Sequence, residues 1–408
     1  MVGRPTDRGA EDFEPGTGVP MKRLKEACNK VFGRLSSSRV TNLPVVLLPA
    51  GEERGAVSIS YISRPLRGTP AGSNARGHSN ASEVVAMTEV WREEGFRVEV
   101  CDYNDRSYRP PSDCVVAIDI HDNLQRWVSR GGSFRKVHHA TGCHWRFQND
   151  AEIRRLAALR DRRGVDLQAR RQVAPSRGAE LADEITVLGN GFTVDTFRFA
   201  GKPITRIPIS SAYGFAWPHD REFSRAKTRF LWLGSYGMVH KGLDLVLEAF
   251  RNMPHLQLSV CGRPEKEDDF YRLYETELTH TANIKFYGWI DMASPVFAEI
   301  ARTHAAVIYP SCSEGGGGAV IHCMHAGLMP ITTPEASVDL GDFGISIEDG
   351  TVEAVAKAAE HAALLDTKET ECRARAAWEY ARSNHTLDKF RSAYREFVRT
   401  FLQKERSR

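Results

Sequence analysis

The segment that decides the fold runs from Tyr309 to Thr333 and has the sequence YPSCSEGGGGAVIHCMHAGLMPITT. The apolar run 305–309 predicts a buried strand that enters this segment. Four glycines, Gly315 to Gly318, follow a polar turn, and the apolar residues 319–326 predict a helix that Gly327 ends. Residues 329–333 predict a further strand. Strand, glycine loop, helix and strand in this order indicate an α/β fold.

The glycine loop also indicates a type of ligand. Glycines let backbone amides approach a ligand closely, and amides at a helix N-terminus favour a phosphate. Glu314, just before the glycines, would accept hydrogen bonds from sugar hydroxyls. We therefore predict a ligand that carries both phosphate and hydroxyl groups. The alternative is a tight connection that is merely rich in glycine.

The rest of the second half alternates strands with helices. Strands are predicted at 230–233, 256–261 and 284–287, and each precedes a glycine, namely Gly234, Gly262 and Gly288. Helices are predicted at 243–251, 269–278 and 295–302. This alternation favours a parallel, doubly wound sheet, in which ligands bind at the carboxyl ends of the strands. The loops after residues 233, 261, 287 and 309 should therefore line one crevice.

The first half has a similar but less regular pattern. Strands are predicted at 45–48, 57–62, 96–101, 114–120, 136–140, 184–188 and 204–209, with a helix at 82–94. A linker is predicted at 210–227, and the last long helix at 387–402. A further helix, 152–171, is unusually rich in arginine. It fits either a salt-bridged surface helix or a contact with an anionic acceptor or membrane surface.

Length, composition and charge favour some classes of protein and argue against others. The chain has 408 residues, enough for two domains, with 41% apolar and 26% charged residues. No apolar run is long enough to span a membrane. The eight cysteines are scattered without a CxxC pair, which favours reduced thiols in the cytosol. The net charge of +3 gives no reason to expect nucleic-acid binding. We expect a cytoplasmic protein, with the Arg-rich helix as a candidate contact with the inner membrane face.

Two stretches resemble the donor-site signatures of the retaining family-4 glycosyltransferases, which have the GT-B fold. In the first, Pro310-Ser311 leads to Glu314-Gly315, as in that family. In the second, residues 230–250 (FLWLGSYGMVHKGLDLVLEAF), Lys241 stands where the family has a lysine that stabilises the departing diphosphate. The resemblance covers 230–333 well and the first half in outline. It implies that a sugar passes from a nucleotide diphosphate sugar to an acceptor, with retention and without an obligatory metal or other cofactor.

The resemblance also implies which residues form the site. Catalytic roles fall to Glu314, Lys241 and His144; the family sometimes places a key histidine in the first domain, and His138 and His139 are the alternatives to His144. Donor binding falls to Gly234, Ser235, Gly237, Lys241, Gly262, Arg263, Gly288, Ser313, Glu314, Gly315, Gly316, Gly317, Gly318 and His322. The acceptor-side candidates are His78, Asn80, His139 and Thr141.

Two positions depart from the family pattern. Ser235 stands where the family usually has an arginine, and Arg263 is a candidate substitute cation. His322 stands where the family has a second glutamate, which grips the ribose; an imidazole accepts from only one hydroxyl. Two alternatives therefore stay open: an inactive scaffold or nucleotide-sugar binder with this fold, or another GT-B enzyme such as an epimerase or a phosphorylase. A metal site at His322 and His325 is a weaker interpretation.

The predicted architecture is α/β of the GT-B type, with two Rossmann-like, doubly wound domains that face a central cleft. Residues 1–40 form an N-terminal extension, 41–212 an acceptor-binding domain and 213–385 a donor-binding domain. Residues 386–408 form a C-terminal helix that packs back on the first domain. The expected partners are a nucleotide sugar and an acceptor, which could be a glycan, a lipid-linked sugar or a small molecule.

Overall fold

The computed structural model describes residues 43–67 and 79–406, and the predicted extension 1–40 lies outside them. Within these ranges, the first half forms one seven-stranded sheet in the order β1-β3-β2-β4-β5-β6-β7. Its strands are β1 Val45–Leu47, β2 Ala56–Tyr61, β3 Arg97–Asp102, β4 Cys114–Asp119, β5 Arg135–Ala140, β6 Glu184–Leu188 and β7 Ile204–Ile207. All pairs are parallel except β1 with β3. Its helices are α2 Ser79–Glu93, α3 Asn123–Ser129, α4 Trp145–Arg163, α5 Gly178–Leu181 and α6 Gly191–Asp195.

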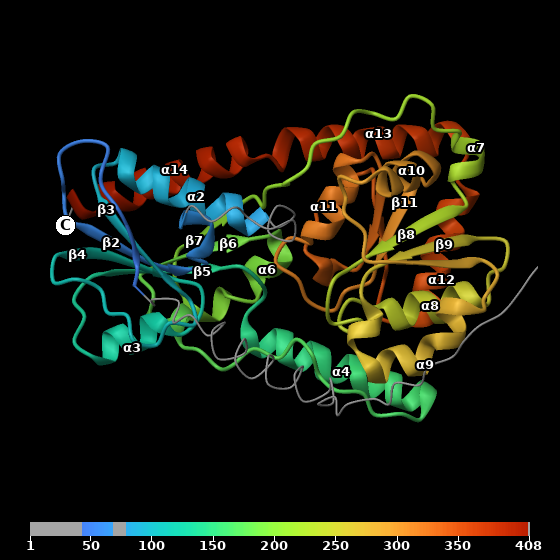
Figure 1. Ribbon diagram of the computed structural model, residues 1–408, viewed down its shortest axis with the longest axis horizontal. Helices are drawn as coiled ribbons and strands as arrows, with labels where there is room; N and C mark the ends of the chain where they lie inside the picture. Colours follow the sequence, from blue (N-terminus) through green and yellow to red (C-terminus); the bar gives the residue numbers. More distant parts are fainter. Residues whose placement is uncertain (1–42, 68–78, 407–408) are drawn as a thin grey trace, which may run out of the picture. The chain divides into compact units, whose positions relative to one another are not determined.

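The second half forms a six-stranded sheet, parallel throughout, in the order β10-β9-β8-β11-β12-β13. Its strands are β8 Arg229–Leu233, β9 Gln257–Cys261, β10 Ile284–Gly288, β11 Ala306–Tyr309, β12 Met329–Thr332 and β13 Ile345–Ser346. The helices are α7 Phe223–Ala226, α8 Leu243–Arg251, α9 Asp268–Thr279, α10 Pro295–Thr303, α11 Gly318–His325, α12 Val352–Leu364, α13 Thr367–Asn384 and α14 Leu387–Arg406. Helices α10, α11 and α13 lie on one side of this sheet and α8, α9 and α12 on the other (Figure 1).

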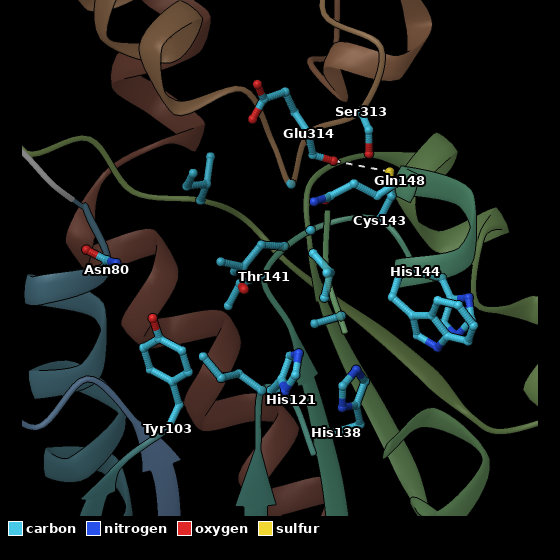
Figure 2. A pocket seen from close by; sticks show the side chains of 18 of the residues that line it. Asn80, Tyr103, His121, His138, Thr141, Cys143, His144, Gln148, Ser313 and Glu314 are labelled. Atoms are coloured by element: carbon cyan, nitrogen blue, oxygen red, sulfur yellow. Dashed lines mark hydrogen bonds between the residues drawn. The ribbon is translucent and has the colours of Figure 1, made fainter. Parts of the chain in front are cut away.

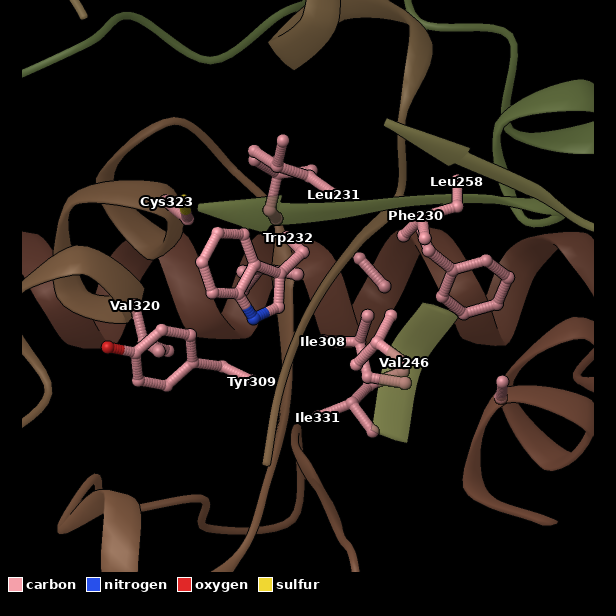
Figure 3. Packing of buried hydrophobic residues seen from close by; sticks show 14 of the residues in the cluster. Phe230, Leu231, Trp232, Val246, Leu258, Ile308, Tyr309, Val320, Cys323 and Ile331 are labelled. Atoms are coloured by element: carbon pink, nitrogen blue, oxygen red, sulfur yellow. The ribbon is translucent and has the colours of Figure 1, made fainter. Parts of the chain in front are cut away.

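The core of the second half surrounds Trp232 on β8 (Figure 3). Its indole is fully buried and stacks on the ring of Tyr309, with ring centroids 6.3 Å apart. A side chain at Gly234 would place its Cβ 2.4 Å from this indole, and one at Gly262 would lie 2.6 Å from the Gly234 carbonyl oxygen. Because the indole fills this space, both glycines are required for packing, apart from any contact with a ligand.

Helix α14 returns to the first half, as predicted. It packs beside α2 (Figure 1), and the Trp91 indole donates a hydrogen bond of 3.1 Å to the Tyr394 hydroxyl. Arg395 and Arg399 of α14 pair with Glu93 and Glu94 at 2.7 and 2.9 Å. These exposed pairs contribute little to stability, so the buried aromatic face of α14 provides most of the attachment.

The Arg-rich helix differs from its prediction in its bounds, and its ion pairs favour one of the two predicted roles. It begins at Trp145 and ends at Gly164, whose positive φ of 69° suits a glycine, so it is α4 and does not continue to residue 171. Arg162 pairs with Asp244 of α8 at 2.8 Å, and Arg163 pairs with Glu277 of α9 at 3.0 Å. These arginines hold α4 against the second half, which fits the salt-bridged interpretation and leaves them unavailable to an external anionic surface.

None of the helices in the described ranges is both long enough and apolar enough to cross a membrane.

Candidate active site

Two cavities meet at Glu314. One, here called the C-side cavity, has a volume of about 530 Å³ and is lined mainly by loops of the second sheet. The other, the N-side cavity, has a volume of about 570 Å³ and is lined mainly by loops of the first sheet. Ser79, Glu314 and Gly318 line both cavities. Glu314 therefore stands where a ligand in one cavity would meet a ligand in the other.

The Glu314 carboxylate is held through one of its two oxygens. Oε1 accepts hydrogen bonds from Lys241 Nζ at 2.6 Å, the Tyr309 hydroxyl at 2.9 Å and the Ser311 hydroxyl at 3.1 Å. Burial alone would raise the pKa of Glu314, but neighbouring cations, of which Lys241 contributes most, lower that pKa to about 2. The carboxylate is therefore ionised at neutral pH. Three donors on Oε1 leave Oε2 as the oxygen that can accept a hydrogen bond from a ligand.

Lys241 is held in place by its surroundings. Its ammonium also donates to the Tyr309 hydroxyl at 2.7 Å. Its backbone is also held, since the Lys241 amide donates a hydrogen bond to the Gly237 carbonyl at 2.9 Å. The next residue, Gly242, precedes α8 and has a positive φ of 72°. The residue thus presents one buried cation at the mouth of the C-side cavity.

The predicted crevice forms because β10, β9, β8 and β11 are adjacent in the sheet. Gly234, Ser235, Gly262 and Arg263 line the C-side cavity as predicted. Gly288 does not line it; the Gly288 carbonyl accepts from the Gly262 amide at 2.9 Å, and the next residue lines the cavity in its place.

His322 also lines the C-side cavity, but it contacts the linker between the two halves. Its Nε2 accepts a hydrogen bond from the Ala212 amide at 3.4 Å. Its ring meets the ring of Tyr213 edge to face, with centroids 5.2 Å apart. His322 therefore positions residues 212–213 at the edge of the cavity. It and His325 do not form a metal site with a third ligand, since no group of three or more candidate ligands occurs among the described residues.

Gly237 departs from its predicted role. Its amide donates to Glu267 Oε1 at 2.6 Å, and the residue does not line the C-side cavity. The adjacent Met238 amide donates to Glu267 Oε2 at 3.1 Å. Because Glu267 already occupies these amides, they cannot bind a diphosphate in this conformation.

The four glycines before α11 have different surroundings. Gly315, Gly317 and Gly318 line the N-side cavity, whereas Gly316 packs against Gly189 of the first half. A Cβ at Gly315 would lie 2.1 Å from the Thr141 carbonyl oxygen, so this glycine lets the two halves approach closely. Gly318 is the first residue of α11 and lines both cavities. Its position suits an anion at the helix N-terminus.

The predicted acceptor-side residues fall into three groups. Asn80 and Thr141 line the N-side cavity, with Asn80 in the first turn of α2 (Figure 2). His139 does not; it is fully buried in the first sheet, and its Nδ1 lies 2.7 Å from the Thr186 hydroxyl. Burial lowers the pKa of His139 to about 4. Its assignment to the acceptor site was wrong because it points into the core. His78 lies outside the described residues.

His144 and Ser313, which were assigned to catalysis and donor binding, both line the N-side cavity. The His144 ring packs on Phe199 and Phe197, at centroid distances of 4.6 and 5.6 Å, and its Nε2 is buried without a hydrogen-bond partner in the described structure. Figure 2 shows the ring on the far side of Cys143 from Asn80. His144 therefore borders the cavity from an aromatic cluster.

Several cavity residues were missed by the sequence reasoning. Tyr103 and His121 line the N-side cavity because they follow the carboxyl ends of β3 and β4. Applying the strand-end rule to the first sheet as well would have found both. Arg171 and Lys266 also line a cavity. Arg171 ends the Arg-rich segment 152–171, for which an anionic acceptor was one interpretation, whereas Lys266 ends a short 3-10 helix, Pro264–Lys266, and was not predicted.

Two doubly wound sheets, with a ligand cavity at the strand ends of each and a carboxylate between them, define a GT-B protein. Solved structures share this fold. Sucrose-phosphate synthase from Thermosynechococcus elongatus matches with a TM-score of 0.57 at 14% identity, covering 86% of this chain and 100% of that one. WaaG, a glycosyltransferase involved in lipopolysaccharide biosynthesis, matches with a TM-score of 0.50 at 16% identity, covering 83% and 98%. Anabaena HepE matches with a TM-score of 0.52 at 13% identity, covering 84% and 99%.

The class of enzyme follows from the second half. Residues 227–364 match the family model described as glycosyl transferases group 1. No curated protein matches the chain. Residues 227–364 are therefore similar to a group 1 glycosyltransferase domain, and the chain has a GT-B fold. The predicted fold and the predicted resemblance to glycosyltransferases are confirmed at this level.

Proposed function

We propose that the protein transfers a sugar from a nucleoside diphosphate sugar to an acceptor and retains the anomeric configuration. The observation that carries this proposal is the Lys241–Glu314 pair at the junction of the two cavities. The nucleotide would bind in the C-side cavity and the acceptor in the N-side cavity. The sugar to be transferred would lie at Glu314 between them.

The residues have distinct roles in this arrangement. Lys241 would stabilise the charge that develops on the diphosphate as it leaves, assisted by the N-terminus of α11. Arg263, whose guanidinium lies 4.9 Å from the Trp289 ring centroid, would supply a second cation from the same cavity. Glu314 Oε2 would accept hydrogen bonds from hydroxyls of the donor sugar.

Retention is proposed from the resemblance of residues 230–333 to retaining family-4 glycosyltransferases, and the state of Glu314 indicates which mechanism would achieve it. A double displacement needs a carboxylate that is free to attack the anomeric carbon. Glu314 is a weak nucleophile, because its pKa is about 2 and three donors hold Oε1. We therefore propose that catalysis rests on positioning and on charge stabilisation of the leaving group. NMR of the product would show the same anomer as the donor; the opposite anomer would contradict retention.

The donor can be identified by thermal shift. A nucleotide that binds the folded state raises its melting temperature. HepE was solved with UDP and glucose, so UDP and its sugars are the first to test, followed by GDP, CDP, ADP and TDP sugars. One clear stabiliser that Lys241→Ala abolishes would support the proposal, whereas no response from any of them would contradict it.

We also propose that no metal is required, because Lys241 and Arg263 supply cationic charge where the diphosphate would bind. Transfer should then persist in excess EDTA. Loss of activity in EDTA, restored by added Mg²⁺ or Mn²⁺, would contradict this point.

A cytoplasmic location also stays a proposal, supported by the seven described cysteines, all of which are unpaired.

A binding protein without transferase activity is the second candidate, favoured by His322. Its Nε2 is engaged by the Ala212 amide, so it grips a ribose less readily than a carboxylate would. In this case a nucleotide sugar would bind, but neither transfer nor hydrolysis would follow. An epimerase would instead convert the nucleotide sugar without acceptor, and a phosphorylase would depend on phosphate.

A further inference from the structure

Arg171 enters the N-side cavity from the segment after α4, and its backbone is fixed there. The Arg171 amide donates to both carboxylate oxygens of Glu152, at 2.8 and 3.1 Å, and its carbonyl accepts from the Gln148 side chain at 2.5 Å. Its aliphatic stem packs on Gly237, where an added Cβ would lie 2.5 Å from Arg171 Cγ. The side chain therefore leaves a rigid backbone in a defined direction.

The guanidinium of Arg171 differs from those of its neighbours in having no direct ion pair among the described residues, although its charge helps to lower the pKa of Glu314. Arg162, Arg163 and Arg170 each form an ion pair of 3.0 Å or less with an acidic residue of the second half. Arg171 forms no ion pair within the described residues, and its Nε is buried without a hydrogen-bond partner there. A partly buried guanidinium without a directly paired anion is costly, and a ligand with an anionic group would lower that cost.

The two cavities differ in the number of lysines and arginines that line them, which indicates a different ligand for each. Lys241, Arg263 and Lys266 line the C-side cavity, which gives it enough cations for a diphosphate. Among the described residues that line the N-side cavity, Arg171 is the one lysine or arginine. Two histidines of the cavity, His138 and His144, do not add charge at neutral pH, since burial lowers the pKa of His138 to about 3 and also lowers that of His144.

Two acidic side chains line the same cavity and must be weighed against Arg171: Glu314, whose carboxylate is paired with Lys241, and Glu83. Glu83 of α2 accepts from the Ser210 amide at 2.8 Å and from the Ser210 hydroxyl at 2.9 Å. Burial raises the pKa of Glu83 to about 7, so its charge is incomplete at neutral pH. The other polar groups of the cavity include Asn80, Tyr103 and Thr141, which suit hydroxyls.

From these observations we infer that the acceptor is an anionic, hydroxylated molecule, whose phosphate or carboxylate binds Arg171 while its hydroxyls contact the neutral polar wall of the N-side cavity. This inference rests on the proposed function. A planar guanidinium binds phosphate or carboxylate through two parallel hydrogen bonds, which fixes orientation as well as affinity. Arg171 would thereby aim one acceptor hydroxyl at the donor sugar beside Glu314.

The test is calorimetric binding to the full chain saturated with the nucleoside diphosphate that stabilises it most. Glucose 6-phosphate and glucuronate are compared with glucose. At least one anionic sugar should bind about tenfold or more tightly than glucose, the effect expected of a charge-assisted pair. Arg171→Gln should remove this preference, and Arg171→Lys should retain part of it. Arg154→Gln, an exposed change on α4, serves as the matched control and should have no effect.

Each other outcome counts against the inference. Equal binding of the anionic and neutral sugars would overturn it, as would an equal loss in Arg154→Gln. If Arg171→Gln instead weakens binding of the nucleoside diphosphate, Arg171 belongs to the donor site, and this result also overturns the inference. If no nucleotide binds the wild-type chain, the proposed function fails and the inference fails with it. If the nucleotide binds but no anion preference exists, the inference alone fails. Melting temperatures of the variants identify any that do not fold.

Discussion

Lys241 and Glu314 lie 73 residues apart in the chain, yet Lys241 Nζ and Glu314 Oε1 are 2.6 Å apart in the structure. The pair forms because β8 and β11 are neighbouring parallel strands, so the loops after them meet at one edge of the sheet. Each member compensates the buried charge of the other. A ligand that engages either residue must therefore act on both.

The first prediction concerns this pair. Lys241→Met should lower the rate of transfer by about 100-fold or more, because a cation that meets the leaving group is lost. It should also weaken binding of the nucleoside diphosphate. Glu314→Gln should slow transfer far more than it changes nucleoside diphosphate binding, since the free oxygen of Glu314 would face the sugar in the proposed arrangement. Initial rates and calorimetry measure both effects. Lys357→Met, at an exposed ion pair, is the control; wild-type activity in Lys241→Met would remove the site from consideration.

A second prediction tests the close approach at Gly315. Gly315→Ala would force a Cβ to within 2.1 Å of the Thr141 carbonyl oxygen, so the loop must shift. We expect a loss of about 1–3 kcal/mol in the free energy of unfolding, as in other overpacked sites, and reduced transfer. Gly214→Ala is the matched control, because nothing lies within 4 Å of its added Cβ. Equal behaviour of the two variants in urea unfolding would show that the contact is not needed.

A third prediction compares the contributions of two arginines of α4 to the free energy of unfolding. Arg162→Met leaves Asp244 buried without its ion-pair partner and should cost about 3 kcal/mol in the free energy of unfolding. Arg160→Met removes only exposed pairs with Asp161 and Asp166 and should cost less than about 1 kcal/mol. Chemical denaturation measures both. The assignment of α4 as an internal clamp would be wrong if Arg160→Met proved the more harmful change.

A fourth prediction concerns pH. Burial lowers the pKa of several histidines to about 3 or 4, below the usual value near 6.5; they are His138, His139, His240, His304 and His385. Their contribution to stability is complete above pH 6.5 and is lost as the pH falls toward 4, because the unfolded chain binds protons first.

Four buried acids, whose pKa values burial raises, oppose this trend; they are Glu83, Asp119, Asp244 and Glu267. The pKa of Glu83 is raised to about 7 and that of Asp244 to about 6, so their contribution is lost as the pH rises from about 4.5. The histidines outnumber these acids, so the free energy of unfolding should decrease between pH 6.5 and 4.5. Urea unfolding at several pH values measures it, and constant stability over this range would contradict the assigned burial. His139→Gln should reduce the slope.

The sequence predicted local features well. The strand before Tyr309, the glycine loop, α11 and the alternation of the second half follow from periodicity and turn chemistry, which act over a few residues. Glu314 was predicted from its place before the glycine loop, whereas Lys241 was assigned from the family resemblance of residues 230–250. The bounds of α4 were predicted less well. Its helical pattern starts at Trp145 with few apolar residues, and the arginines after Gly164 continue the composition without continuing the helix.

By itself, then, the sequence determined the elements and the residues that end its parallel strands. Only the tertiary structure decided which of the adjacent histidines faces the cavity: His138 lines it, whereas His139 points into the core, because successive side chains of a strand alternate between faces. The tertiary structure also brought Arg171 to the N-side cavity and turned the Gly237 amide toward Glu267. Such contacts join segments far apart in the chain, and they depend on packing between elements, which local pattern does not encode.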